Sequence, residues 1–407
     1  MEVVQIVPRL PPSIDGVGDY AWLLAKQLRA AHDIQTVFVV CDPGWENVAS
    51  GKQKTKSEDA KSKTEKPSSL LDGFPIHRLN ERSADGLLQV ISQPGMPATV
   101  LLQYVGYGYE KRGCPVWLAR GLSAWSRGKP NAEAGRQKVD LEFQHSTSSH
   151  HPERRLLTMF HELYAFGPPW SSSFWTSPVQ KWIAKRLANA SDGCRTNTKM
   201  FADVLLQMSP RHADSLATFP VFSNMGEPKN PPPLQQRKRQ MLVFGSAIWR
   251  RKIYMDHIEA LTRACHILRA EKIVDVGEPT GIKPNVALPV EEMGRQPALT
   301  VSRWLGESMA GFLTYFDDSL AKSGVFAAYC AHGVLPVLAS RSVSDPDGIR
   351  ADNEYLSALD MQEHITETEM QAVADQAQAW YRRHSLAATA ANLAVSLSEC
   401  QSTNIDA

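Results

Sequence analysis

The sequence is poor in cysteine, and its cysteines are not arranged for cross-linking or metal binding. The 6 cysteines are spread along 407 residues: Cys41, Cys114, Cys194, Cys265, Cys330 and Cys400. They form no C-x-x-C pair and stand at no zinc-finger spacing from a histidine, so neither a disulfide framework nor a structural zinc site is indicated. We predict reduced thiols buried in the core, and this pattern favours the cytoplasm.

Long apolar segments are also missing. No charge-free stretch reaches the ~20 residues that a membrane span requires. The apolar start, Val3 to Val7, is short, has no basic residues before it and is followed by prolines, so it predicts a first strand rather than a signal peptide. We therefore predict no transmembrane segment, while a peripheral contact with a membrane surface stays open.

Neither sign of charge is in excess. Lys and Arg number 44 and Asp and Glu number 43, which leaves a net charge of +1. A chain without a general positive field is not expected to bind nucleic acid, and any anionic ligand must be met by a local cluster of donors. Since 43% of the residues are hydrophobic, disorder of the whole chain is excluded, and small-molecule chemistry becomes the first expectation.

Short β-branched runs alternate with longer amphipathic runs in both halves of the chain. The N-terminal half gives strands at 3–7, 36–41, 99–104 and 156–161, with helices at 17–28 and 179–190. The C-terminal half gives strands at 241–246, 272–277, 311–316 and 334–339, with helices at 254–268, 299–307 and 324–331. This rhythm predicts an α/β fold of two Rossmann-like parallel-sheet domains facing across a cleft.

The predicted domains are residues 1–222 and 241–366, joined by a proline-rich linker at 223–240 and followed by C-terminal helices and a tail at 367–407. Two polar stretches, 51–69 and 128–155, predict surface insertions in the first domain. The second insertion holds His145, His150 and His151, for which a solvated loop is favoured over a metal site. We predict no metal and no cofactor.

Two motifs fall at strand ends of the N-terminal half. In PPSIDGVGDYAWLLAKQL, Gly16 and Gly18 stand where a helix N-terminus favours an anion, although a tight turn without a ligand is equally indicated. In MFHELYAFGPPWSSSFW, His161 ends an apolar strand and is a candidate for proton transfer or for donation to developing charge, although a purely structural histidine is about equally indicated. The aromatic residues that follow, Tyr164, Phe166, Trp170, Phe174 and Trp175, predict loop packing or, as a weaker alternative, stacking on a sugar.

Two further motifs suit phosphate groups in the C-terminal half. VFGSAIWRRKIY places Arg250, Arg251 and Lys252 where a helix begins after a strand, a position typical of diphosphate binding. A solvated basic surface is the alternative. Lys322, Ser323 and Gly324 open a helix of small residues after another strand, which is again a place for an anion.

Together these motifs resemble the family 4 glycosyltransferases of the two-domain GT-B fold, over nearly the whole chain. The resemblance implies a nucleotide-diphosphate sugar as co-substrate and a retaining, metal-independent hexosyl transfer to an acceptor that the sequence does not identify. It implies that His161 is catalytic and that Asp19, Tyr20 and Glu162 contact sugar or acceptor. Donor phosphates would be bound by seven residues already named: Gly16, Gly18, Arg251, Lys252, Lys322, Ser323 and Gly324.

Three positions depart from that family. Ser246 stands where the family has an arginine, and Leu320 and Ala328 stand where it has two glutamates eight residues apart. These departures keep a second hypothesis open, a catalytically inactive GT-B homologue that serves as a binding partner or scaffold. A sugar-nucleotide epimerase on the same fold is a third, weaker alternative.

Overall fold

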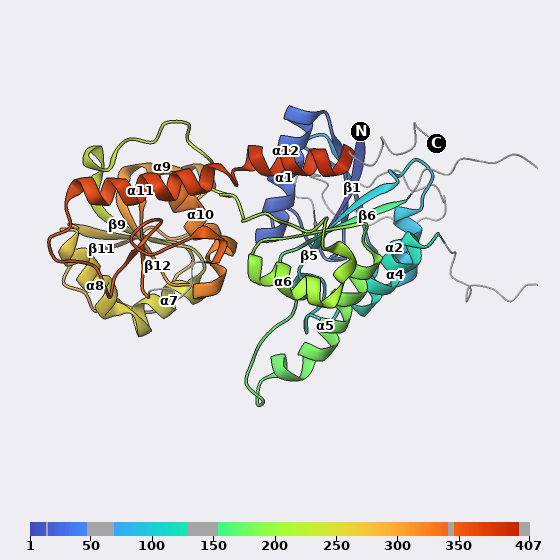
Figure 1. Cartoon of the computed structure of the whole chain (residues 1–407), viewed down its shortest axis with the longest axis horizontal. Helices are drawn as coiled ribbons and strands as arrows, with labels where there is room; N and C mark the ends of the chain where they lie inside the picture. Colours follow the sequence, from blue (N-terminus) through green and yellow to red (C-terminus); the bar gives the residue numbers. More distant parts are fainter. Residues whose placement is uncertain (14, 47–68, 129–153, 341–345, 399–407) are drawn as a thin grey trace, which may run out of the picture. The chain divides into compact units, whose positions relative to one another are not determined.

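The computed structural model describes residues 1–13, 15–46, 69–128, 154–340 and 346–398. They divide into two compact units, each built around one β-sheet (Figure 1). The first unit comprises Met1–Thr196 and Phe201–Ala217, and the second comprises Asn197–Met200 and Thr218–Ala407.

The sheet of the first unit has the strand order β3-β4-β2-β1-β5-β6-β7-β8. Its strands are β1 (Glu2–Val7), β2 (Gln35–Val40), β3 (Ser69–Leu71), β4 (Phe74–Arg78), β5 (Thr99–Tyr104), β6 (Arg155–Phe160), β7 (Gly193–Thr196) and β8 (Ala217–Thr218). The strands from β4 to β7 pair in parallel, and β3 is antiparallel to β4. From β4 to β7 this is the doubly wound order, in which ligands bind beyond the carboxyl ends of the strands where the order reverses, here β1 and β5.

Helices connect these strands. They are α1 (Gly16–His32), α2 (Ala84–Ile91), α3 (Gly106–Tyr109), α4 (Val116–Ser126), α5 (Ser172–Ala190) and α6 (Lys199–Met208). In α1 the predicted apolar stripe is buried at Ala21, Leu24 and Leu28, because residues three and four apart share one helix face. Ala21 belongs to a core cluster that also holds Val7 of β1 and Phe38 of β2.

The sheet of the second unit has the order β11-β10-β9-β12-β13-β14, and every pair in it is parallel. Its strands are β9 (Lys238–Phe244), β10 (Lys272–Val276), β11 (Val290–Glu292), β12 (Ser308–Leu313), β13 (Leu335–Leu338) and β14 (Leu356–Ser357). This is again the doubly wound order, with the reversal between β9 and β12. The sequence prediction of two parallel-sheet domains is confirmed.

Helices lie on both sides of this second sheet (Figure 1). They are α7 (Ala247–Asp256), α8 (Ile258–Ile267), α9 (Ala298–Glu307), α10 (Gly324–Ala331) and α11 (Glu367–Arg382), and α12 (Leu386–Ser398) follows α11 in the chain. The helix predicted at 254–268 is instead two helices that meet at His257. The strand predicted at 311–316 is shifted to Ser308–Leu313, since Tyr315 and Phe316 belong to the segment that follows it.

The segment predicted as a linker, residues 223–240, lies within the second unit. Leu234 is buried in that unit's core, its N–H donates to Gln371 of α11 at 2.8 Å, and Lys238 begins β9. The segment is therefore part of a domain rather than a free connection. Most of both predicted insertions, with His145, His150 and His151, lies outside the described residues.

All five described cysteines are free thiols, as predicted, and four of them are also buried as predicted. Cys41, Cys194, Cys265 and Cys330 are buried without a disulfide, whereas Cys114 is half-buried. No helix among the described residues is long and apolar enough to cross a bilayer.

Candidate functional site

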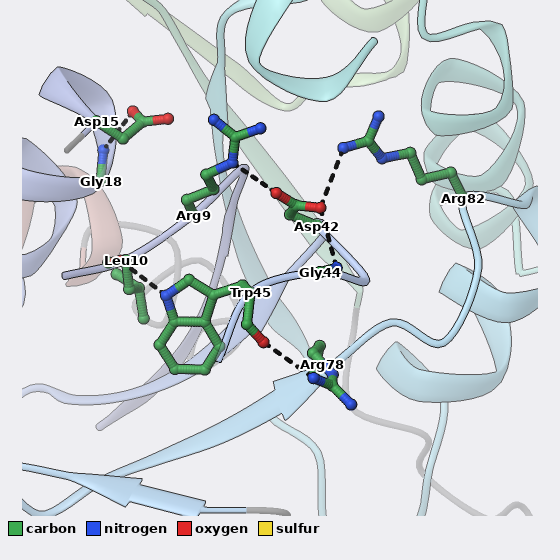
Figure 2. A network of polar contacts seen from close by, with 9 residues as sticks. All are labelled: Arg9, Leu10, Asp15, Gly18, Asp42, Gly44, Trp45, Arg78 and Arg82. Carbon is green, nitrogen blue, oxygen red and sulfur yellow. Dashed lines mark hydrogen bonds and ion pairs between the residues drawn. The ribbon is translucent and has the colours of Figure 1, made fainter. Parts of the chain in front are cut away.

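A charged cluster lies beyond the carboxyl ends of β1 and β2 in the first unit. The Asp42 carboxylate accepts from Arg9 Nε at 2.6 Å, from Arg82 at 3.4 Å and from the Gly44 N–H at 3.1 Å. Figure 2 shows the two guanidinium groups on either side of this carboxylate. Two cations against one anion leave the cluster positive, and Arg9 remains 42% exposed.

The electrostatics of the cluster favour the ionised carboxylate. Partial burial by itself would raise the pKa of Asp42, but the hydrogen bonds from Arg9 and Gly44 and the charges of Arg9 and Arg82 together lower it. The loop that carries Asp42 is held from its other side, where Trp45 Nε1 donates to the Leu10 carbonyl at 2.7 Å (Figure 2). Sequence reasoning missed this cluster, although each of its charged residues follows a strand end.

The glycine turn at the start of α1 is explained by packing at Gly18. A Cβ on Gly18 would stand 2.3 Å from the carbonyl oxygen of Arg9, so only glycine lets α1 approach β1 this closely. Asp15 caps the helix, and its carboxylate accepts from Val17 N–H at 2.9 Å and from Gly18 N–H at 3.0 Å. The prediction that the Gly18 N–H binds a ligand is therefore corrected, whereas Gly16 is exposed with no atom within 4 Å of a Cβ.

His161 follows β6 directly and is buried. Its Nε2 lies 2.9 Å from Gln103 Oε1, and its ring meets that of Tyr20 edge-on with centroids 4.9 Å apart. The Gln103 amide group donates to Gln5 Oε1 at 3.0 Å, so its oxygen faces His161 and accepts from the ring. The structure thus brings His161 and Tyr20 together and fixes the orientation of the imidazole through side chains of β5 and β1.

Tyr104, the last residue of β5, carries a polar group that sequence reasoning missed. The Tyr104 hydroxyl is buried and has no hydrogen-bond partner among the described residues, and burial, followed by the charges of Cys114 and Glu162, raises the pKa of Tyr104. A buried hydroxyl without a partner is uncommon and is a candidate to bind a ligand. Glu162 and Asp19 are both half-buried, at the end of β6 and in the first turn of α1.

Of the three cations predicted at the start of α7, Arg250 has a structural role. It is 1% exposed and pairs with the Asp275 carboxylate, and it also donates to the carbonyls of Gly245 and Glu278. The Tyr254 hydroxyl donates to the same carboxylate. Because this network engages the guanidinium, the suggestion that Arg250 binds a diphosphate is corrected.

The other two cations lie near the reversal point of the second sheet. Arg251 and Lys252 are exposed, and Arg251 donates to the Thr280 carbonyl at 2.8 Å beyond the end of β10. Lys252 Nζ stands 5.7 Å from the centre of the Trp249 ring. Trp249 contacts two aromatic residues that follow β12, with ring centroids 5.0 Å from Tyr315 and 5.2 Å from Phe316. Sequence reasoning missed this aromatic cluster.

The second anion motif lies at the start of α10. The Ser323 hydroxyl accepts from the Phe326 N–H at 3.2 Å, so it caps the helix, and its side chain is buried. Lys322 is half-buried and Gly324 is exposed, with no atom within 4 Å of a Cβ there. Ser323 thus has a structural role as a cap, and Lys322, Ser323 and Gly324 stay candidates for phosphate binding.

The positions that depart from the resembled family are enclosed by protein. Leu320 is 2% exposed and Ala328 is fully buried. In the described part of the chain, no group of three or more His, Cys, Asp or Glu side chains is placed to hold a metal ion.

No protein-family model and no curated protein matches the chain. Solved structures match it over nearly its whole length. A protein from Listeria monocytogenes described as a UDP-N-acetylglucosamine 2-epimerase is 14% identical, with coverage of 99% of this chain and 97% of the other and a TM-score of 0.54. The lipopolysaccharide outer core galactosyltransferase WaaB is 10% identical, with 98% and 99% covered and a TM-score of 0.53.

An alpha-glucosyltransferase solved with UDP-glucose and DNA containing an abasic site is 9% identical, with 99% and 98% covered and a TM-score of 0.50. At these identities the likeness concerns the fold alone. The chain is similar in fold to these GT-B proteins, which confirms the predicted fold class.

Proposed function

We propose that the chain is a glycosyltransferase that moves a hexose from a nucleotide-diphosphate sugar to an acceptor. The observation that carries the proposal is the doubly wound second unit, in which exposed cations and an aromatic cluster lie together at the point where strand order reverses. The similar structures add support, because they include an alpha-glucosyltransferase bound to UDP-glucose and a galactosyltransferase.

The donor is assigned to the second unit. Arg251 and Lys252 supply positive charge for a diphosphate, with Lys322 and Gly324 as further phosphate contacts. The exposed Phe316 and the neighbouring Trp249 offer aromatic faces on which a nucleobase stacks. The cations suit the diphosphate and the aromatic rings suit the nucleobase, so this edge of the second sheet matches both ends of a nucleoside diphosphate.

The acceptor and the transferred sugar are assigned to the first unit. His161 is oriented by Gln103, so it presents a fixed imidazole to the sugar, and the buried Tyr104 hydroxyl is a ready partner for a ligand hydroxyl. Gly16, Asp19, Tyr20 and Glu162 stay part of this proposal on the family resemblance. From that resemblance alone, the transfer is proposed to be retaining and metal-independent, and the cysteine pattern supports a cytoplasmic location.

A binding protein without transferase activity is the second candidate. The observation that favours it is that Leu320 and Ala328 are buried apolar residues where the resembled family has glutamates. This candidate shares the nucleotide site with the first and differs from it in turnover. The two are therefore separated by measuring binding and turnover on the same protein.

The binding experiment is a thermal-shift panel with UDP, GDP, ADP, TDP and CDP and their common sugars. A ligand at 100 times its dissociation constant stabilises by ~2.7 kcal/mol, and we expect one nucleotide to do this for the wild type and to lose most of the effect in Lys252→Ala. Lys238→Ala is the matched control. Lys238 begins β9, whereas Lys252 follows the other end of that strand, and Lys238 pairs with Glu307 on the surface. Replacing Lys238 should therefore leave nucleotide binding unchanged.

Turnover is measured as release of the nucleoside diphosphate from the sugar nucleotide that the panel identifies. His161→Ala should lower the rate about 10²–10³-fold, the usual loss for one fixed donor, with little change in nucleotide binding. His32→Ala, at the end of α1, is the control. Binding without turnover would support the non-catalytic candidate, and a panel without any response would refute both.

A further inference from the structure

An exposed aromatic surface lies on α5 and the loop before it. Its members are the large apolar side chains of this segment that face solvent: Phe166, Trp170, Phe174, Trp175, Val179 and Trp182. Trp170 is 87% exposed, Phe166 72% and Trp175 71%. The prediction that these aromatic residues pack a loop is therefore wrong for these three positions.

The position of this surface is fixed by the opposite face of α5. Ile183, Ala184 and Leu187 are buried, and Gln180 anchors the segment, since its Oε1 accepts from Ala165 N–H at 2.6 Å and its Nε2 donates to the Arg112 carbonyl at 2.9 Å. The aromatic side chains are thus held outward by the packing of the other face. Figure 1 shows the first half of α5 and the preceding loop projecting away from the sheet of the first unit.

The same segment is purely basic. From Leu163 to Ser191 the sequence contains no Asp or Glu, and its charges are Lys181, Lys185 and Arg186. Lys181 Nζ lies 4.5 Å from the centre of the Tyr164 ring, and the Arg186 guanidinium lies 5.4 Å from that of Trp182. Aromatic and cationic groups therefore alternate along the outward face of one helix.

A basic pocket of about 640 Å³ borders the second half of this helix. It is lined by Lys185 and Arg186 of α5, by Trp182, and by Arg127 and Arg211 from neighbouring segments. Its one acidic lining residue, Asp192, accepts from the Leu156 N–H at 2.8 Å. Four cations against one anion make the pocket a place for an anionic group.

We propose that α5 and the loop before it bind the surface of an anionic phospholipid bilayer. Tryptophan and phenylalanine side chains insert at the level of the lipid headgroups, and basic residues beside them attract anionic lipids. The projecting aromatic residues would enter the interface, while the pocket and the helix cations would meet phosphate groups. Basic residues beside an aromatic surface fit a negatively charged membrane, and the proposal does not depend on sugar transfer.

The test is co-sedimentation of the full-length protein with vesicles of phosphatidylcholine alone or with about one third phosphatidylglycerol. We expect binding to the anionic vesicles that salt weakens. The double variant Trp170→Ser/Trp175→Ser should lose at least about tenfold in affinity for these vesicles. The double variant Lys181→Gln/Lys185→Gln should lose about fivefold in affinity for the anionic vesicles for each charge removed. The control is Leu299→Ser, which removes an 87% exposed side chain from the second unit and should leave vesicle binding unchanged.

Three results would overturn the proposal. These are no binding to anionic vesicles, equal binding to both kinds of vesicle, or binding that survives both double substitutions. Self-association in solution that the tryptophan substitutions abolish, seen by light scattering without vesicles, would assign the surface to a second copy of the chain instead. Because the readout is sedimentation, its failure is distinguishable from failure of the proposed enzymatic activity.

Discussion

Replacing Gly18 by alanine tests the closest approach of helix to strand in the first unit. The added Cβ would stand 2.3 Å from the Arg9 carbonyl oxygen and 3.1 Å from the carbonyl carbon. Both atoms belong to the backbone, so neither can rotate away as a side chain would. Alanine must therefore displace the start of α1 from the segment that follows β1.

The size of the effect follows from the clash. Overpacking of a close contact costs about 1–3 kcal/mol, and at about 2–4 °C for each kcal/mol in a domain of this size we expect Gly18→Ala to lower the melting temperature by roughly 2–12 °C. Gly16→Ala is the matched control, two residues away in the same helix, where no atom lies within 4 Å of the new Cβ. It should be neutral or slightly stabilising.

The assay is thermal melting of wild type and both variants, followed by circular dichroism. The comparison between the two glycines removes the contribution of helix propensity, because both substitutions exchange glycine for alanine in the first turn of one helix. Gly18→Ala as stable as Gly16→Ala would refute the packing explanation and would return Gly18 to the candidate ligand contacts.

Two further predictions concern buried and half-buried carboxylates. Asp275→Asn leaves the Arg250 charge buried without its partner and should lower the free energy of unfolding, measured in urea, by about 3–5 kcal/mol. Glu307→Gln breaks an exposed pair and should lower it by less than about 1 kcal/mol. Equal losses in the two variants would contradict this reasoning. The folded pKa of Asp42 is lowered, so its stabilisation is present above the ordinary carboxyl pKa and is lost as pH falls through the folded value. The stability gap between wild type and Asp42→Asn should be full near about pH 6 and close below about pH 4, and a gap independent of pH would show that Asp42 acts without its charge.

Much of the fold was predictable because both halves follow the alternation of parallel α/β sheets. The strands at Val3 to Val7 and Thr99 to Tyr104 are buried on both faces, so they read as continuous apolar runs. The short strands β3, β8, β11 and β14 were missed, since two or three residues give too little periodicity to detect. Two longer strands, β4 and β7, were missed as well. The break between α7 and α8 at His257 was also missed, because no proline or glycine marks it.

The candidate site was predictable by position but not by partner. His161 was found because it ends an apolar strand. Its hydrogen-bond partner Gln103 lies 58 residues away in the sequence, and Gln5, the partner of Gln103, lies a further 98 residues away. A glutamine inside a buried strand, as in VVQIV and VLLQYV, was the signal available. Conversely, Arg250 looked like its neighbours Arg251 and Lys252, and only the position of Asp275 on β10 shows that it is part of the core.

Ala328, one of the two positions at which the resembled family carries a glutamate, is enclosed by the packing of α10. From Phe326 to Ala331 every residue of this helix is buried, as expected for a helix that is apolar all round. The Tyr329 hydroxyl donates to the carbonyls of Leu242 and Phe312 at 3.0 and 3.1 Å, and Gly311 leaves room for its ring. A carboxylate at Ala328 would enter this apolar contact, where an unpaired charge is strongly disfavoured. The packing of the second unit therefore disfavours a carboxylate at position 328, and under the proposed function the nucleotide contacts the groups already named: Arg251, Lys252, Lys322, the ring of Trp249 and Gly324 at the start of α10.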